Sequence, residues 1–479
     1  MEKNKPGIGE DWLSLIIGLA IFAISLGALA GIDTLGWGIK THVWTDFSKA
    51  MSPYSKNYQG MSASLSLLLT FLFMAASMAT CAWALRVDVT RYLAGFTTIF
   101  FISYACWVAG HYAYIAATPD KMEKFGIPWS LNLTGEAGYI IALLAGLFIG
   151  NFLPSLGERI KECVRPELYI KIAIVIMGGA LGVKAAESQS LAKTVMFSGL
   201  CSIIVAYLIY WASVYYVARR YFRFSREWAA PLASGISICG VSAAIAVGGA
   251  IRARPIVPIM VSSLVVIFAV VELVLLPFIA RDYLWHEPMV AGAWMALAVK
   301  TDGAAVASGA ITESLILAKT QAETGVMYKE GWILMTTTTV KMFIDIFIGV
   351  WAFVLAVIWS TKIDVEKGAE VKVIEIWHRF PKFVLGYAFT FFFFLALCLA
   401  MPDIIPDAKL ATGEGNVFRK LFFVLTFFTI GVVSNFQKLW EEGIGKLALL
   451  YVISLFGFII WIGLIISWVF FAGIKPPTM

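Results

Sequence analysis

The chain has 479 residues, of which 60% are hydrophobic and only 14% charged, with a mean hydropathy of +0.82. A water-soluble fold of this length could not carry so much apolar surface, and the net charge of +6, spread over many loops, does not suit a nucleic-acid-binding protein. The composition predicts an all-α polytopic membrane protein, because apolar runs of about 18 or more residues recur along the chain, whereas the alternating segments of an outer-membrane barrel do not.

Apolar runs long enough to cross a bilayer follow one another from Trp12 to Phe471. We expect about 11 to 13 transmembrane helices, with 13 if every run crosses. The runs lie near residues 12–31, 63–85, 92–115, 133–153, 168–184, 191–218, 227–250, 255–280, 288–311, 330–360, 383–401, 417–435 and 447–472. No small-residue cleavage site follows the first run, so it is expected to be a retained helix rather than a signal peptide. A small excess of Lys and Arg in the loops on the N-terminal side predicts a cytoplasmic N-terminus in the bacterial inner (plasma) membrane.

Two stretches of the chain resemble each other. Residues 172–212 and 421–461 each contain an apolar helix, a Gly-Val pair, a polar stretch and a long apolar helix. The two pairs begin at Gly182 and Gly431, 249 residues apart, and the predicted spans run the copies in opposite directions. This pattern is typical of an inverted-repeat transporter.

Two spans are interrupted by small residues, 233–250 (ASGISICGVSAAIAVGGA) and 292–310 (GAWMALAVKTDGAAVASGA). Glycine weakens a helix interior, so such clusters indicate either a very close helix crossing or a broken helix. In a broken helix, the free N–H groups at the start of the second half can bind an anion near the bilayer midplane. The candidate substrate-binding residues are Ser237, Cys239, Gly240, Ser242, Lys300, Thr301, Gly303 and Ser308.

The two interrupted segments are also alike, GVSAAIAVGGAI against GAAVASGAI, but their directions conflict. Only one full span separates them, so they would run parallel if each crossed, whereas inverted partners run antiparallel. Either one segment is a re-entrant hairpin, or the predicted span boundaries near residues 281–292 are wrong, or the two segments are alike only in composition.

Lys300 and Lys341 are the basic residues that fall inside predicted spans, together with the acidic Asp302, Asp345 and Glu272. A charge at the centre of a membrane helix costs about 2.5 to 3.5 kcal/mol, so these side chains are expected to face the bundle interior. Lys341 and Asp345 are four residues apart and are expected to pair on one helix face. The pair either only holds helices together or takes part in transport, with Asp302 as a balancing carboxylate or proton acceptor.

The six cysteines show no metal-type spacing, and the four histidines are scattered. The sequence therefore predicts neither a metal site nor a cofactor. It also lacks the clustered catalytic groups of an active site, so no enzyme is expected.

Four motifs follow one another along the chain: LLAGLFIGNFLP at 143–154, IVIMGGALGV at 174–183, SGISICGVSAAIA at 234–246 and PKFVLGYAF at 381–389. Together they resemble the YeiH-like sulfate exporter family of bacterial membrane proteins. The resemblance covers roughly residues 130–475 and implies a transporter with crossed, broken helices, similar in plan to sodium/proton antiporters and bile-acid-type symporters. On this basis residues 1–129, with about three spans, form an N-terminal elaboration, and residues 130–479 form the transporter core with two structural repeats and no soluble domain.

One segment departs from that family. Where many members have a His-Glu pair followed by Val-Ala-Gln-Val, this chain has Lys300, Thr301 and Asp302 followed by Gly-Ala-Ala-Val. A lysine at this position favours an anionic substrate.

The leading hypothesis is secondary active transport of a small inorganic or organic anion, with sulfate, sulfite or an organosulfonate first and a carboxylate next. Na+ or H+ is the expected coupling ion. The alternative is a sodium/proton-type cation antiporter that uses Asp302 and Asp345. The other expected partner is the lipid bilayer, not nucleic acid, and the oligomeric state stays open, a homo-oligomer included.

Overall fold

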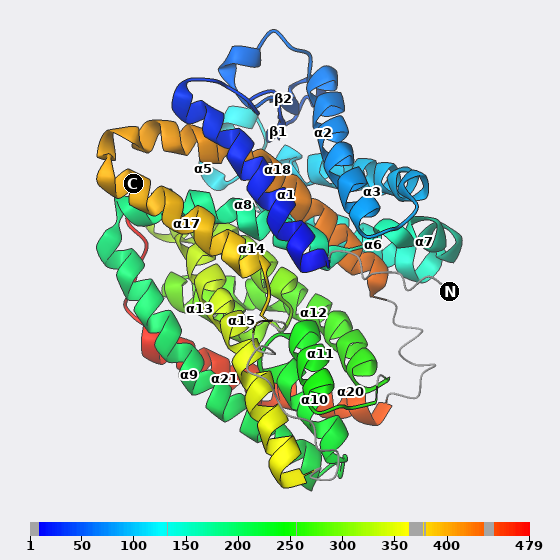
Figure 1. The fold of residues 1–479 in the computed structure, drawn as a ribbon. Coiled ribbons are helices and arrows are strands. Elements are labelled where there is room, and N and C mark those ends of the chain that lie inside the picture. The colour runs from blue at the N-terminus through cyan, green and yellow to red at the C-terminus, as the bar shows by residue number, and fades with distance from the viewer. Residues whose placement is uncertain (1–8, 132, 255, 364–376, 378–379, 435–444) are drawn as a thin grey trace. The chain divides into compact units, whose positions relative to one another are not determined.

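The structure, a computed structural model, describes residues 9–131, 133–254, 256–363, 377, 380–434 and 445–479 (Figure 1). Within these ranges, 10 helices are long and apolar enough to cross a membrane, and a pair bent by 111° makes an eleventh candidate. The prediction of an all-α polytopic membrane protein is confirmed. The chain divides into two compact units, one formed by residues 1–191 with 382–433 and the other by residues 192–381 with 434–479.

The first unit contains six long helices, one bent helix pair and small connecting elements in its described part, and it spans the boundary predicted near residue 130. Its main elements are α1 (Glu10–Ser25), β1 (Ile39–Thr41), β2 (Met51–Pro53), α2 (Ala63–Ala84), α3 (Val89–Gly110), α4 (Ala113–Ala116), α5 (Pro119–Phe125), α6 (Ala137–Phe152), α7 (Pro154–Ile160), α8 (Pro166–Glu187), α17 (Phe383–Ala400) and α18 (Ile405–Val433). The bend lies between α6 and α7, where Pro154 is the first residue of the second helix. Proline cannot continue the preceding helix but is well accommodated at a helix start.

Glycines let the helices of this unit cross at backbone contact. A Cβ added at Gly182 of α8 would collide with the carbonyl oxygen of Phe391 in α17, and one at Gly431 of α18 would collide with that of Leu143 in α6. These are the two glycines that mark the predicted repeat. Each predicted repeat copy thus packs its glycine helix against a helix of the other copy, and this exchange is compatible with an inverted repeat.

A short antiparallel pair, β1 and β2, lies between α1 and α2, with Lys40 opposite Ser52. Trp44, after β1, forms an isolated parallel bridge with Tyr112, in which its N–H donates to His111 O at 3.0 Å and its carbonyl accepts from Ala113 N at 2.8 Å. The hydropathy pattern predicts only a loop here, because strands this short leave little periodic signal.

The second unit contains the two interrupted segments and the helices around them. Its described elements are α9 (Gln189–Arg220), which begins at the end of the first unit, α10 (Arg226–Ser237), α11 (Gly240–Ala250), α12 (Ile256–Tyr283), α13 (Pro288–Ala298), α14 (Asp302–Thr324), α15 (Trp332–Ile358), α20 (Gly445–Ser454) and α21 (Ile460–Phe471). The polar stretch of the second repeat copy, residues 435–444, lies outside the described residues. The corresponding long helix is α20 with α21.

Candidate functional site

The first interrupted segment is a re-entrant hairpin formed by α10 and α11, which lie next to each other in Figure 1. Its two ends meet, because Glu227 Oε1 accepts a hydrogen bond from Arg254 N at 2.7 Å and pairs with Arg254 Nε at 3.0 Å. A continuous helix would place these residues about 40 Å apart. Along the arms, a Cβ added at Gly235 would lie 3.6 Å from Cβ of Ala244. The chain therefore turns back at its tip, Ile238 and Cys239, without crossing.

The second interrupted segment, α13 with α14, is also a re-entrant hairpin. Thr337 of α15 touches both arms: its Oγ1 donates to Gly292 O at 2.8 Å, and its side chain lies directly against Gly309. Near the base, Thr320 Oγ1 donates to Trp285 O at 3.4 Å. The arm before residues 299–301 and the arm after them therefore lie side by side, and the chain turns back at these residues.

These hairpins place the number of crossings at the lower end of the predicted 11 to 13 and resolve the conflict of direction. Neither 227–250 nor 288–311 crosses, so the thirteen predicted runs become eleven candidate spans over the described residues. The helix that joins the hairpins, α12, is long enough to be a full span. The hairpins therefore enter from opposite ends of α12, and their likeness in sequence fits antiparallel partners of an inverted repeat.

The same repeat is visible in how neighbouring helices hold the hairpin arms. Trp211 of α9 donates from Nε1 to Ser234 Oγ of the first hairpin at 2.9 Å. Trp294 of the second hairpin donates from Nε1 to Ile460 O at 2.8 Å, and Ile460 lies 249 residues after Trp211. The offset found in the sequence thus relates the contacts of both hairpins.

The two tips meet inside the unit. The N–H of Gly240 donates to Lys300 O at 2.5 Å, and the N–H of Lys300 donates to Glu272 Oε2 of α12 at 3.0 Å. Gly240 also lies so close to Val265 of α12 that an added Cβ would collide with that side chain. Glycine at this position therefore allows the start of α11 to pack against α12.

Lys341 of α15 ties both tips together. Its Nζ donates to Ile238 O at 3.3 Å and to Val299 O at 3.4 Å, which are the C-terminal carbonyls of α10 and α13. It also lies 3.7 Å from Asp302 Oδ1. A cation at two helix C-termini offsets their partial negative charge, so Lys341 balances the electrostatics of both breaks.

The other charged groups predicted from the sequence gather at the same place. Glu272, Lys300, Asp302, Lys341 and Asp345 are each at most 1% exposed. Lys300 Nζ donates to the carbonyl of Leu297 and lies 4.7 Å from the centre of the Tyr210 ring. The expectation that these side chains face the bundle interior matches their burial in the structure.

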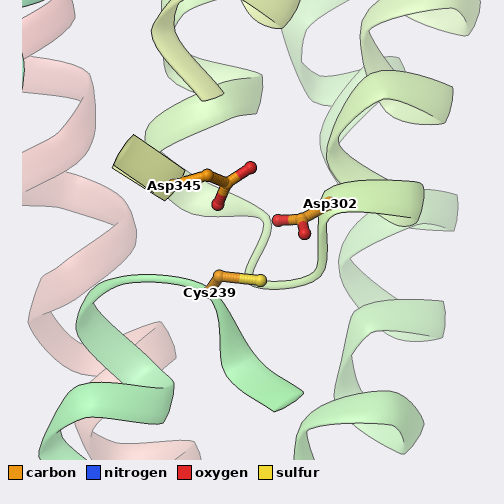
Figure 2. A group of neighbouring side chains, drawn as sticks. All are labelled: Cys239, Asp302 and Asp345. Carbon is orange, nitrogen blue, oxygen red and sulfur yellow. The ribbon is translucent and has the colours of Figure 1, made fainter. Parts of the chain in front are cut away.

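Figure 2 shows Cys239, Asp302 and Asp345, from the first tip, the start of α14 and α15, turned toward one another. Their ligand atoms, one per residue, all lie within 4.8 Å of each other, which is close enough to hold one ion. The spacing of these residues along the chain gives no sign of this cluster, because they come from three different elements.

The remaining candidates surround the tips. Ser237 ends α10 and is 4% exposed, and its Oγ has no hydrogen-bond partner among the described residues. Ser242 is half-buried on α11, and Thr301 caps α14 by accepting from Ala304 N at 3.2 Å. Gly303 is buried in the first turn of α14, whereas Ser308 Oγ bonds within its own helix, to Ala305 O at 2.8 Å.

Sequence reasoning missed the backbone carbonyls of Ile238 and Val299 and the ring of Tyr210. A backbone carbonyl has no side-chain signature. The usable signal is the coincidence of a predicted helix break with a lysine inside a span, because a broken helix end exposes carbonyls that a cation can bind.

Comparisons with known proteins find membrane proteins that are similar to this chain. The family model described as Conserved hypothetical protein 698 matches residues 132–451. A UPF0324 membrane protein of Nitrosomonas europaea is 42% identical over 474 residues, which cover 98% of this chain and 97% of that protein. UPF0324 membrane proteins of Nitratidesulfovibrio vulgaris and Rhodopirellula baltica are each 28% identical, over 76% and 80% of this chain and 57% and 64% of their own lengths. No solved structure matches.

Proposed function

Because this chain belongs to the UPF0324 family of membrane proteins, the YeiH-like family that its motifs resemble, we propose that it is a secondary active transporter of a small anion. The observation that carries the proposal is the pair of re-entrant hairpins that enter from opposite ends of α12 and meet at their tips. A site between two such tips can be covered from one side by one hairpin and from the other side by the second. This arrangement suits alternating access, in which one repeat moves against the other around a fixed site.

The tips supply groups that suit an anion. The second arms, α11 and α14, both begin there, at Gly240 and Asp302, so two helix N-termini with their partial positive charge lie at the site. The hydroxyls of Ser237 and Ser242 lie in the adjoining turns. Lys341 already offsets the C-terminal ends of the first arms, which leaves the positive N-termini to act on a substrate.

The proposed substrates are small anions that several hydrogen-bond donors can bind at once. Sulfate, sulfite and organosulfonates are compact oxyanions that accept several hydrogen bonds, and small carboxylates are next. Uptake of radiolabelled sulfate, sulfite, an organosulfonate and a carboxylate into proteoliposomes containing the full chain tests the proposal.

A matched pair of serine variants sharpens this test. Ser237→Ala should raise the half-saturating anion concentration several-fold, because it removes a buried donor at the tip. Ser202→Ala removes a buried hydroxyl that bonds only its own helix, to Gly199 O at 2.7 Å, and should leave transport unchanged. The proposal fails if none of the four anions is exchanged or bound while the protein is folded.

A second candidate, a cation antiporter, is favoured by one observation: the cluster of Cys239, Asp302 and Asp345. In that case a cation is the transported solute and binds at the carboxylates. Its signature is pH-dependent Na+ flux without any anion, abolished by Asp302→Asn.

A further inference from the structure

We propose that Cys239, Asp302 and Asp345 surround a site for one monovalent coupling cation, H+ or Na+, which moves together with the anion. This inference rests on the proposed function and adds the coupling ion and its stoichiometry.

The positions of the three side chains locate the proposed cation site. Figure 2 shows the carboxylates of Asp302 and Asp345 facing each other, with the sulfur of Cys239 beside them, and their ligand atoms lie within 4.8 Å. Asp302 is 1% exposed, and its Oδ1 accepts no hydrogen bond from any described residue. Lys341 Nζ lies 3.7 Å from this oxygen, and the Asp302 carboxylate as a whole is directed toward that of Asp345.

The summed charge of the buried groups predicts how many cations bind. Around the tips lie three carboxylates and two ammonium groups, those of Glu272, Asp302, Asp345, Lys300 and Lys341. With each group in its ordinary charge state the sum is one negative charge, in an environment where an uncompensated charge is costly. One monovalent cation neutralises it, whereas a divalent cation would leave one positive charge.

The neighbouring side chains do not supply the positive charge that would neutralise the cluster. Lys300 Nζ is held by Leu297 O and the Tyr210 ring, and Lys341 Nζ by the carbonyls at both tips. Tyr207 of α9, a neutral phenol, donates to Ile344 O at 2.9 Å, next to Asp345. Among the described groups that face the cluster, the only cations are therefore the two lysines already counted.

The cation would couple to the anion through electrostatics. Asp302 is the first residue of α14, so its carboxylate offsets the positive N-terminus that is proposed to bind the anion. A cation between Asp302 and Asp345 neutralises that carboxylate, and the N-terminus can then attract the anion. Anion affinity should therefore rise when the cation binds, and cation affinity should rise equally when the anion binds.

The experiment measures cation binding directly, on the purified full chain in nanodiscs. Binding of radioactive Na+ is titrated without anion, and infrared spectra record the C=O band of a protonated carboxylic acid. The variants are Asp302→Asn and Asp345→Asn, with Asp282→Asn as the matched control, since Asp282 lies outside the cluster in an exposed pair with Arg281.

Two results support the inference. If the ion is Na+, one Na+ binds per chain and Asp302→Asn weakens it at least tenfold, whereas the control does not. If the ion is H+, Na+ does not bind, but a protonated-acid band is present and disappears in Asp302→Asn or Asp345→Asn alone. The inference is overturned if the wild type shows neither, or if two or more monovalent cations bind per cluster. Cation binding without any anion binding or flux would leave this site standing and refute the proposed anion transport.

Discussion

Replacing Lys341 with methionine is expected to destabilise the second unit strongly. The substitution keeps the length of the side chain but removes an ammonium that is fully buried, contacts the carbonyls of Ile238 and Val299 and lies 3.7 Å from Asp302. Removing one member of a buried ion pair typically costs about 3 to 5 kcal/mol, because the other charge is left uncompensated. The two freed carbonyls add to this cost. Thermal melting of purified protein, followed by size-exclusion chromatography with fluorescence detection, measures the effect.

A double variant separates the ion pair from the helix ends. In Lys341→Met with Asp302→Asn, no charge is left unpaired by the substitution, so part of the stability should return while the loss from the two carbonyls persists. Lys319→Met is the control: its pair with Asp282, at 3.5 Å, is partly exposed and should contribute less than about 1 kcal/mol. A Lys341→Met protein that melts like the wild type, or a double variant less stable than both single variants, would refute the assigned role of Lys341.

Three further predictions follow from other parts of the structure. Single cysteines at Glu227 and Arg254 should react with an impermeant maleimide from one side of the membrane, and a cysteine at Trp285 from the opposite side; labelling of all three from one side would contradict the hairpins. Gly182→Leu and Gly431→Leu should each lower stability by about 1 to 3 kcal/mol or more through overpacking, whereas Gly157→Leu, with open space around it, should melt like the wild type. Burial lowers the pKa of His111, just after α3, to about 4. On acidification the unfolded state therefore binds a proton first, and the free energy of unfolding should fall by up to about 3 kcal/mol as the pH drops from 6.5 to 4. The His111→Gln variant should show a flatter pH dependence of stability, and an unchanged slope would contradict this role of His111.

Hydropathy was sufficient to locate most helices. The run predicted at 63–85 is the helix Ala63–Ala84, whereas the run predicted at 417–435 is a helix that begins twelve residues earlier, at Ile405. Membrane helices are predictable because each must satisfy its own backbone within a long apolar stretch. Small residues also marked both interrupted segments, but composition could not tell a crossing from a hairpin. That distinction depends on contacts between distant residues, such as Glu227 with Arg254.

The candidate site was predictable as a set of residues but not as an arrangement. Helical spacing favours Asp345 as the partner of Lys341, and the structure also brings Asp302 to 3.7 Å from another element. Asp345 lies in the cluster with Cys239 and Asp302, which helical spacing alone does not predict. These contacts depend on how the two hairpin tips pack together, and no local sequence pattern predicts that packing.

The exchanged packing of the two repeats also bears on how the protein is made. The glycine face of α6 meets α18 at Gly431, and Gly182 of α8 meets α17 at Phe391. The ribosome adds roughly 5 to 20 residues per second, so a helix whose partner comes some 200 to 290 residues later waits about 10 to 60 s for it. During that time the early helices sit in the membrane with their small-residue faces uncovered. Packing of this unit is therefore completed only late in synthesis, after α17 and α18 have been made, and a chain truncated before residue 383 should be recognised as an orphan and degraded.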